Sequence, residues 1–373
     1  MILVSVNAMA PSQPLDRLGR PLGVLRLSLT ARCNLACPYC LPDGLEPAGL
    51  LSLEQRTRLI GAAVALGARS LRLTGGEPLL HDGLEALIRA AATLRRGRES
   101  RPGAAARDAS EAALEDIALT SNGTLLSASR ARALREAGLD RITLSLDGAD
   151  GASVARMAGL ADAAAGARAL ERVLAAIDHA LAAGFDPARG QLKLNAVIQP
   201  GRNDDQLLPL AALARERGLE LRLIEFMDVG NRNGWRPEAV LSAEAMLARI
   251  ARQWPLDPQG RPPHGTARRW RYRDGGGPVA VVASVSAPFC GDCNRLRVTA
   301  DGIAYTCLFA SPERGLDLRP WLGPGSSEAD LRQAIASLWG GRADRWSEER
   351  LAAWQDSGTG RASAHAEMAY LGG

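Results

Sequence analysis

Residues 33–40 read Cys-Asn-Leu-Ala-Cys-Pro-Tyr-Cys and space three cysteines as C-x3-C-x2-C. This stretch follows residues 24–29, whose alternating apolar side chains predict a strand that ends in a cysteine-bearing loop. Three thiolates are one fewer than the four that complete a [4Fe-4S] cluster or a structural zinc site. The stretch therefore indicates a metal site with one open position, at which a small molecule could bind and react.

A second group of three cysteines lies near the other end of the chain. Cys290, Cys293 and Cys307 follow the spacing C-x2-C-x13-C, and the two groups together account for all six cysteines. A chain of 373 residues can bury a sizeable core without disulfides. We therefore expect two incomplete metal sites in a reducing cytoplasm, and not three disulfides.

Strand-like and helix-like segments alternate through the first two thirds of the chain. This rhythm predicts an α/β fold, a partial (β/α)6 barrel of the TIM type with right-handed connections. In such folds the chemistry lies at the carboxyl ends of the strands, where the cysteine loop and several further turns converge. The predicted strands are residues 24–29, 71–73, 117–120, 142–146, 192–198 and 221–226, and the later turns include 74–78, 121–123, 145–147 and 227–230.

The rhythm breaks after about residue 235, which divides the chain into three parts. Residues 1–20 are expected to be an N-terminal tail and residues 21–235 the partial barrel. Residues 236–373 are expected to be a smaller C-terminal α+β domain that carries the second cysteine group. Residues 97–113, rich in Arg, Ala and Gly, are expected to be an exposed insertion to which we assign no function.

The composition excludes several classes of protein. Apolar residues make up 46% and charged residues 23%, as in ordinary soluble proteins. The net charge of +4 is too small to indicate nucleic acid, although it suits a small anionic substrate. No apolar run reaches the roughly 18 residues of a membrane span, and the first residues lack a basic leader. We therefore expect a cytoplasmic protein without nucleic-acid or membrane partners.

Two sets of motifs resemble known families. The first cysteine group after the first strand, with Gly75-Gly76-Glu77-Pro78 after the second, resembles the radical S-adenosylmethionine (SAM) superfamily. Residues 289–297, Phe-Cys-Gly-Asp-Cys-Asn-Arg-Leu-Arg, resemble the molybdenum cofactor biosynthesis protein A family, the GTP 3',8-cyclases. Residues 224–230 and the terminal Gly372-Gly373 resemble the same family, and the resemblance extends from about Leu25 to Gly373.

The resemblance implies cofactors and contacts. It implies two [4Fe-4S] clusters, one on Cys33, Cys37 and Cys40 that binds SAM and one on Cys290, Cys293 and Cys307 that holds the guanine end of GTP. The implied SAM contacts are Tyr39, Gly76, Ser145 and Met227, with Asn195 beside them, and Gly75 and Gly76 are expected to let the backbone approach SAM. The implied GTP contacts are Arg26, Arg72, Thr120, Lys193, Arg295, Leu296 and Arg297, with Arg222 as an addition.

The resemblance also implies a reaction. It is the lyase-type cyclisation of GTP to (8S)-3',8-cyclo-7,8-dihydroguanosine 5'-triphosphate, the first step of molybdopterin biosynthesis. A 5'-deoxyadenosyl radical abstracts H3', and the C3' radical attacks C8. Gly372 and Gly373 are expected to thread into the active site. The product is expected to pass to cyclic pyranopterin monophosphate synthase and the protein to be a homodimer, while the sequence does not identify the electron donor.

The sequence leaves two other interpretations open. A radical SAM peptide maturase would also carry an auxiliary cluster, but such enzymes typically use more downstream cysteines than the three present here. A structural protein with two zinc ions would need a fourth ligand at each site, and none stands near either group. His81 occupies a position where the family usually has Arg, and all four histidines are expected to serve surface or core packing.

Overall fold

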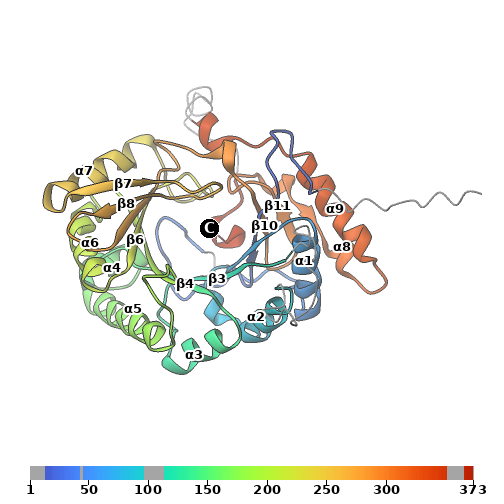
Figure 1. Ribbon diagram of the computed structural model, residues 1–373, viewed down its shortest axis with the longest axis horizontal. Helices are drawn as coiled ribbons and strands as arrows, with labels where there is room; N and C mark the ends of the chain where they lie inside the picture. The colour runs from blue at the N-terminus through green and yellow to red at the C-terminus, as the bar shows by residue number, and fades with distance from the viewer. Residues whose placement is uncertain (1–12, 43–44, 96–112, 351–364, 373) are drawn as a thin grey trace, which may run out of the picture.

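The computed structural model describes residues 13–42, 45–95, 113–350 and 365–372. Within them, six strands and their connecting helices form the alternating unit predicted from the sequence, so the α/β prediction is confirmed (Figure 1). The elements in chain order are β1 (Val24–Ser28), α1 (Leu53–Ala65), β2 (Ser70–Thr74), α2 (Leu84–Ala92), β3 (Asp116–Ser121), α3 (Ala128–Glu136), β4 (Arg141–Ser145), α4 (Gly151–Ala158), α5 (Ala163–Ala182), β5 (Leu192–Ile198), α6 (Leu207–Glu216) and β6 (Glu220–Glu225).

The C-terminal part lengthens the same sheet at both edges. β10 pairs in parallel with β1, and β9 pairs in parallel with β6. The strand order is β12-β11-β10-β1-β2-β3-β4-β5-β6-β9-β8-β7, so the sheet curves round an interior without closing. These later elements are α7 (Ala243–Gln253), β7 (Leu256–Gly260), β8 (Arg268–Tyr272), β9 (Pro278–Val282), β10 (Arg295–Val298), β11 (Ile303–Tyr305), β12 (Leu316–Asp317), α8 (Arg319–Leu322), α9 (Glu328–Gly340) and α11 (Met368–Leu371).

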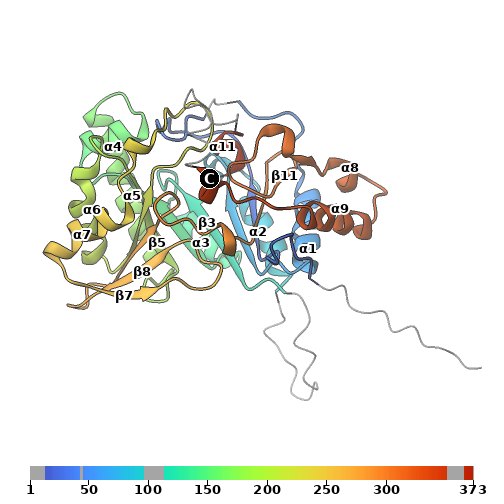
Figure 2. The same cartoon turned by 90° about the horizontal axis from the view of Figure 1, so that it is seen from above.

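Alternation along the strands separates the core from the interior space. Leu25 and Leu27 of β1 are 1% and 0% exposed and belong to the hydrophobic core. Because successive side chains point to opposite faces of a sheet, Arg26 faces the other way, towards the inside of the curved sheet. The two views show the helices outside the strands and α11 inside them (Figures 1 and 2).

Local signals in the sequence set the helix boundaries. Ser52 begins α1 with a capping box, in which its side chain accepts from Gln55 N while the Gln55 side chain accepts from Ser52 N. Asp162 and Ser242 cap α5 and α7 in the simpler way, through one side-chain acceptor each. These caps satisfy backbone N–H groups at the starts of the helices and so set where each helix begins.

Two predicted segments are described only in part. Of the predicted N-terminal tail, residues 13–20 are packed on the fold, with Asp16 and Arg20 buried and an isolated bridge joining Leu15 to Pro21. Of the predicted insertion at 97–113, only Ala113 is described, and it is buried. The remainder of both segments lies outside the described residues.

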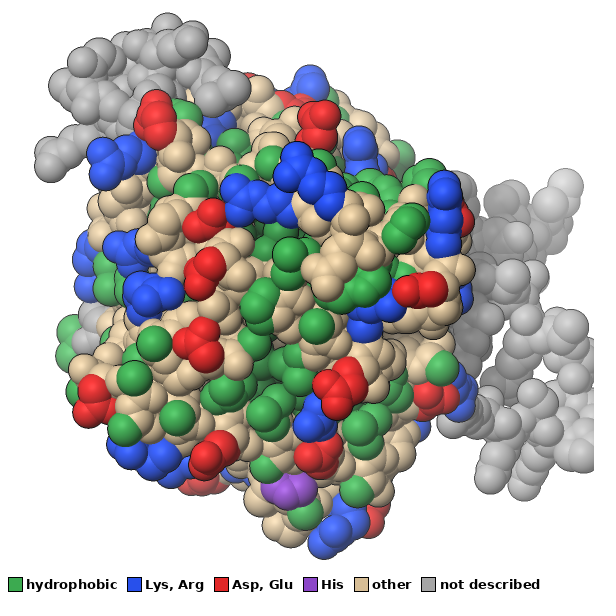
Figure 3. Space-filling view, turned by 90° about the vertical axis from the view of Figure 1, so that its left-hand side faces the viewer, with side chains coloured by type: hydrophobic (Ala, Val, Ile, Leu, Met, Phe, Trp, Pro, Cys, Tyr) green, Lys and Arg blue, Asp and Glu red, His purple; other side chains and the backbone are tan. Residues whose placement is uncertain are grey.

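The surface shown in Figure 3 carries basic and acidic side chains interspersed with apolar ones, and they do not gather into a patch of one sign on that face. A search of the described residues found no helix with both the length and the apolar character that a bilayer crossing requires.

Candidate active site

The first cysteine group lines a cavity at the carboxyl ends of β2, β3 and β4. Cys33, Cys37 and Cys40 are all partly exposed and unpaired, and Gly75 and Gly76 lie on the same cavity wall. The loop turns tightly, because Cys40 N and Leu41 N both donate to Cys37 O, at 2.9 and 2.8 Å. Leu41 adopts a φ of +43°, which directs the chain away after the third cysteine.

Burial raises the pKa of all three thiols in this cavity. The pKa of Cys40 rises to about 12. Burial also raises the pKa of Cys37, and the negative charge of Asp147 acts in the same direction. The pKa of Cys33 is raised in the same direction. A metal centre binds thiolates and so reverses this preference. The chemistry of this donor set, three reduced thiols on one cavity, fits an iron–sulfur cluster with one open iron.

The glycine turn after β2 packs directly on the approach to the cysteine loop. A Cβ on Gly75, whose φ is +146°, would lie 2.4 Å from Thr30 O, and a Cβ on Gly76 would lie 2.1 Å from Arg32 O. The two glycines are therefore required by the close packing of two backbone segments. This requirement is additional to the approach to SAM that the sequence predicted.

Glu77, next in this turn, joins the loops after β2 and β3. It is 1% exposed, and its carboxylate accepts from Leu79 N at 2.9 Å, the Ser121 hydroxyl at 2.8 Å and Asn122 N at 2.7 Å. The Asn122 side chain in turn donates to Asn34 Oδ1 at 2.8 Å. One buried carboxylate therefore holds the β3 loop against the cysteine loop.

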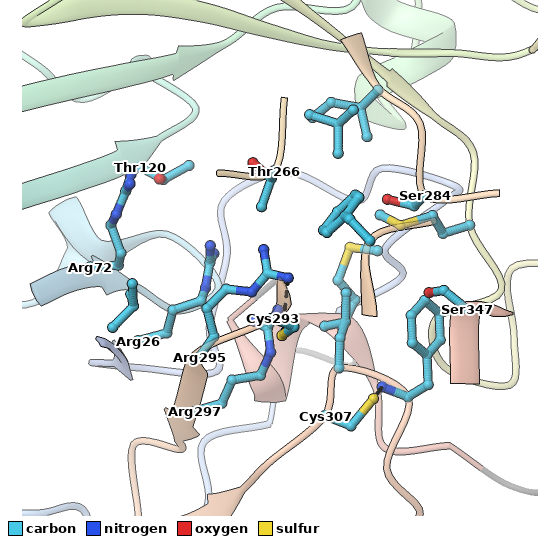
Figure 4. Close-up of a pocket in the computed structure, with 18 of the residues that line it drawn as sticks. Arg26, Arg72, Thr120, Thr266, Ser284, Cys293, Arg295, Arg297, Cys307 and Ser347 are labelled. Atoms are coloured by element: carbon cyan, nitrogen blue, oxygen red, sulfur yellow. Dashed lines mark hydrogen bonds between the residues drawn. The ribbon is translucent and has the colours of Figure 1, made fainter. Parts of the chain in front are cut away.

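The second cysteine group lines a larger, adjoining cavity. Cys290, Cys293 and Cys307 share it with Arg26, Arg72, Asn195, Arg222, Met227, Arg295 and Arg297. Figure 4 shows Cys293 and Cys307 in this cavity with Arg26, Arg72, Arg295 and Arg297. Five residues line both cavities and so form a shared wall: Tyr39, Thr120, Ser145, Asp147 and Met368. The structure thus brings the two cysteine groups to neighbouring cavities, with most of the predicted SAM and GTP contacts around them.

The thiols of the second group differ in their surroundings. Burial raises the pKa of Cys290, and it raises that of Cys307 to about 12. Burial acts in the same direction on Cys293, but the charges of Arg295 and Arg342 outweigh it and lower the pKa to about 6. Arg295 Nη2 also donates to Cys293 Sγ at 3.1 Å. This environment stabilises a thiolate, the form in which cysteine binds metals.

Within the part of the chain that is described, no three His, Cys, Asp or Glu side chains converge on a point where one ion could bind them all. A zinc ion needs such convergence, because each of its ligands binds the same atom. In a [4Fe-4S] cluster the cysteines bind different irons, so wider spacing is compatible with it.

Three arginines form a row across the neighbouring strands β10, β1 and β2. The register pairs Arg297 with Arg26 and Arg26 with Arg72. Burial and the neighbouring arginine charges lower the pKa of Arg26, and burial lowers that of Arg72 to about 9. Arg72 forms no hydrogen bond or ion pair with the described residues, so this guanidinium is available to an anion in the cavity.

Two predicted GTP contacts lie elsewhere. Leu296 is 0% exposed and belongs to the hydrophobic core, because alternation along β10 directs it away from the face of Arg295 and Arg297. Lys193 is 3% exposed near the start of β5, where its Nζ lies 3.2 Å from Glu220 Oε1. The structure brings neither side chain into the cavity.

The C-terminal segment reaches into the space between the strands. Gly372 O accepts from Arg26 Nε at 3.0 Å and Nη2 at 2.7 Å, and from Arg297 Nη1 at 3.4 Å. Gly372 adopts a φ of +66°, and a Cβ there would lie 2.5 Å from both Ser28 Oγ and Thr74 Cγ2. The structure therefore places Gly372 beside the arginine row, while Gly373 lies outside the described residues.

Several cavity residues were not among the metal, SAM or GTP contacts predicted from the sequence. Asp147 accepts from the Tyr39 hydroxyl at 2.6 Å and from Val197 N at 2.8 Å, and it lines both cavities. The turn at residues 145–147 was predicted to lie at the site, but no role was assigned to Asp147 itself. Arg342 and Asp344 also line the second cavity, but they come from the segment after α9, where no motif indicated a site.

The histidines differ in their positions. His81 Nε2 contacts Arg56 Nη1, and burial followed by the Arg56 charge lowers the pKa of His81. His264 lines the second cavity, where its backbone N donates to Asp292 Oδ2 at 2.7 Å. His365 is buried against Trp346, with a ring-centroid distance of 4.7 Å. His81 lines neither of the two cavities.

Comparisons with known proteins identify the class first. The parallel α/β array with an open three-cysteine site is that of a radical SAM protein, and the family model described as the Radical SAM superfamily matches residues 27–214. The family model described as Molybdenum Cofactor Synthesis C matches residues 219–348. These matches do not test the domain boundary at residues 235/236, which stays a prediction.

Relatives then identify the family. A GTP 3',8-cyclase of Synechococcus sp. (strain CC9605) is 60% identical over 367 residues, covering 98% of this chain and 100% of the relative. One from Xanthomonas campestris pv. campestris (strain B100) is 45% identical over 372 residues, covering 98% of each chain. The chain belongs to the GTP 3',8-cyclase family.

Among solved structures, the fold is similar to that of Streptococcus suis SuiB bound to S-adenosylmethionine. The TM-score is 0.57 at 15% sequence identity, over 86% of this chain and 67% of that chain. At this identity the similarity concerns the fold alone.

Proposed function

We propose that the protein is a radical SAM lyase that cyclises GTP to (8S)-3',8-cyclo-7,8-dihydroguanosine 5'-triphosphate, the first step of molybdenum cofactor biosynthesis. One observation carries the proposal: two groups of three cysteines line adjoining cavities that share the wall of Tyr39, Thr120, Ser145, Asp147 and Met368. A radical formed in one cavity then has only a short path to a substrate held in the other.

In the first cavity, Cys33, Cys37 and Cys40 hold a [4Fe-4S] cluster, and Tyr39, Gly76 and Ser145 hold SAM. When bound and reduced, the cluster and SAM supply the radical that removes the hydrogen at C3' of GTP. Tyr39 is kept in place by its hydrogen bond to buried Asp147. Met227 and Asn195, which line the second cavity, contact SAM from that side.

In the second cavity, Cys290, Cys293 and Cys307 hold a second [4Fe-4S] cluster, whose open iron takes the guanine end of GTP. The triphosphate is bound by guanidinium groups, which suit bidentate contacts to phosphate oxygens. Arg72 is the strongest candidate, because it lacks a partner in the described chain and lines the cavity beside Thr120 (Figure 4). Arg295, Arg297 and Arg222 are further arginines that line this cavity.

The C-terminal glycines act in this cavity through Arg26. Gly372 O accepts hydrogen bonds from two nitrogens of Arg26. We therefore assign two roles to Arg26, holding the C-terminal segment and binding the triphosphate. We assign to Gly372 and Gly373 a catalytic position beside the reacting ribose. Lys193 and Leu296 would contribute only from outside the cavity wall, Lys193 through the charge cluster around Glu220.

We further propose a reducing cytoplasmic location, a homodimeric state and transfer of the product to cyclic pyranopterin monophosphate synthase. The location is supported by six unpaired cysteines, since such thiols persist in reducing compartments. The donor of the final electron and proton is not assigned.

The test is anaerobic reconstitution followed by assays with dithionite, SAM and GTP. About eight irons per chain and GTP-dependent formation of 5'-deoxyadenosine and the cyclised product support the proposal. Deoxyadenosine formation that is insensitive to GTP and is stimulated by a peptide would favour the peptide maturase. Zinc bound in place of iron would favour the structural protein.

A further inference from the structure

A buried cluster of three charged side chains lies behind the second cysteine group. Arg20 Nε lies 2.5 Å and Arg342 Nη1 lies 3.2 Å from the same oxygen, Asp16 Oδ2. The side chains of Asp16, Arg20 and Arg342 are 0%, 2% and 2% exposed. Asp16 and Arg20 come from the start of the chain, whereas Arg342 follows α9.

Each guanidinium binds the backbone of one cysteine. Arg20 Nη1 donates to Cys290 O at 2.6 Å, and Arg342 Nη1 donates to Cys293 O at 2.6 Å. Arg20 Nη1 also donates to Asp344 O at 3.0 Å. A single carboxylate thus fixes two guanidinium groups, and these fix both ends of the C-x2-C turn.

Additional bonds hold the N-terminal segment in place. Arg17 N donates to Arg342 O at 3.1 Å, and Trp339 Nε1 donates to Arg20 O at 3.0 Å. The Asp16 carboxylate also accepts from Arg20 N at 2.9 Å. The segment from residue 16 to residue 20 is therefore part of the wall behind the cysteines, and not a tail.

Stability alone does not explain this cluster. Burying three charges costs free energy of desolvation that apolar side chains of similar volume would avoid. Arg20 Nη2 is buried without a hydrogen-bond partner among the described residues, whereas Arg342 Nε makes no hydrogen bond but lies 3.6 Å from Asp344 Oδ2. The cluster costs free energy of desolvation, and it holds the carbonyl groups of two predicted cluster ligands. These two properties together indicate a role at the second cluster.

We propose that Asp16, Arg20 and Arg342 are positioning residues for the second cluster: they hold Cys290 and Cys293 so that both thiols face the cavity. This inference rests on the proposed function, because it requires that the second cysteine group holds a cluster. Positioning of ligands by surrounding hydrogen bonds is general at metal centres, and its loss lowers occupancy.

The main variant is Asp16→Asn, which keeps the shape of the side chain and removes its charge. After anaerobic reconstitution we expect iron to fall from about eight to about four per chain, because the first cluster remains. SAM cleavage by dithionite in the absence of GTP is expected to persist. The change that GTP causes in the electron paramagnetic resonance spectrum of the second cluster is expected to disappear.

The control is Asp116→Asn, which breaks the partly buried pair with Arg141 at the amino ends of β3 and β4, where Arg141 Nε lies 2.6 Å from Asp116 Oδ1. It is expected to lose stability but to retain about eight irons. Arg20→Lys is the second variant, because one ammonium cannot reach Asp16, Cys290 O and Asp344 O together. It is expected to lose part of the second cluster even if Asp16→Asn fails to fold.

The outcomes separate this inference from the proposed function. If the unmodified chain binds only about four irons, both the second cluster and the positioning role are wrong. If the unmodified chain, Asp16→Asn and Arg20→Lys all bind about eight irons and respond equally to GTP, the positioning role is wrong and the proposed function stands.

Discussion

Arg26 and Gly372 are 346 positions apart in the sequence, yet two nitrogens of the Arg26 guanidinium bind the Gly372 carbonyl oxygen, at 3.0 and 2.7 Å. The contact joins β1, which leads into the first cysteine loop, to the C-terminal segment, whose Met368 lines both cavities. Arg26 therefore links the two proposed cofactor sites.

The fit of Gly372 leads to a prediction for Gly372→Ala. Its Cβ would lie 2.5 Å from Ser28 Oγ and Thr74 Cγ2, so the tail must move. We expect cyclisation to fall by at least about tenfold while both clusters remain, since steric overpacking of this kind costs about 1–3 kcal/mol. The measurement is product formation with iron content determined in parallel.

A matched control for this variant is Gly234→Ala. Gly234 has a φ of +63°, close to the +66° of Gly372, but a Cβ there has no neighbour within 4 Å. Both variants carry the same backbone penalty, so only the steric contact differs. Equal activities of the two variants would show that the position of the tail does not matter for cyclisation.

Arg72 and Arg26 are expected to separate binding from turnover. Arg72→Ala removes the guanidinium that has no partner in the described chain, so we expect KM for GTP to rise about tenfold to a hundredfold with little change in kcat. Arg26→Ala releases the tail, so we expect the larger effect on kcat. Steady-state kinetics over a range of GTP concentrations distinguishes the two.

Arg273→Ala is the control for these arginine variants, because Arg273 is exposed and pairs with Asp257 outside the cavity. Its GTP kinetics should match those of the unmodified chain. A KM for GTP in Arg72→Ala equal to that of the unmodified chain would show that Arg72 does not bind the triphosphate.

Glu77→Gln tests the connection between the β2 and β3 loops. The Glu77 carboxylate accepts three hydrogen bonds, and an amide would place a donor against Asn122 N or against the Ser121 and Leu79 donors. We expect a loss of about 1–3 kcal/mol in the free energy of unfolding, from one unpaired buried group. We also expect slower SAM cleavage in the absence of GTP.

Denaturant titration of the cluster-free chain measures the stability of this variant, and Glu328→Gln on the surface of α9 serves as the control. A stability equal to that of the control would mean that the Glu77 carboxylate is not needed to hold the loop.

The Asp116–Arg141 pair predicts a pH dependence of stability. Burial acts to raise the pKa of Asp116, but the hydrogen bonds and charge of Arg141 outweigh it and lower the pKa below 3.8. Between the lowered pKa of the folded state and the ordinary pKa of the unfolded state, the folded chain binds fewer protons than the unfolded chain. The contribution of the pair to the free energy of unfolding is therefore fully present above about pH 4–5 and is lost as pH falls through the lowered pKa.

Asp116→Asn removes this dependence. The difference in stability between the unmodified cluster-free chain and Asp116→Asn should therefore shrink as the pH falls from about 5 towards 3. Urea titrations at several pH values measure it. A difference that stays constant over this range would contradict the assigned pKa shift.

Local patterns were sufficient to predict the strand–helix array and the convergence of the strand-end loops. Alternation in residues 24–29 and the two cysteine spacings need no knowledge of distant contacts. The same alternation also places Leu296 opposite Arg295 and Arg297, so its burial could have been read from the sequence. The burial of Lys193 could not be predicted in this way, because it depends on the pairing of Lys193 with Glu220 of the next strand.

Contacts between distant parts of the chain could not be predicted. Arg20 reaches Cys290 across 270 positions, and no local pattern marks residues 13–20 as anything other than a polar lead-in. The ion pair of Asp16 and Arg342 could not be predicted either, because it depends on the pairing of β10 with β1. The structure therefore adds most information about contacts between the first described residues and the C-terminal part of the chain.

The pairing of β10 with β1 and of β9 with β6 has a consequence for how this protein can be divided. A chain ending after β6 would expose the hydrogen-bonding groups of both β1 and β6 as bare sheet edges, which invite pairing with other chains. The later strands would lose their template at the same time. The two regions therefore cannot be exchanged as independent modules, and gene fusions or split versions cut at this point should aggregate unless both pieces are produced together.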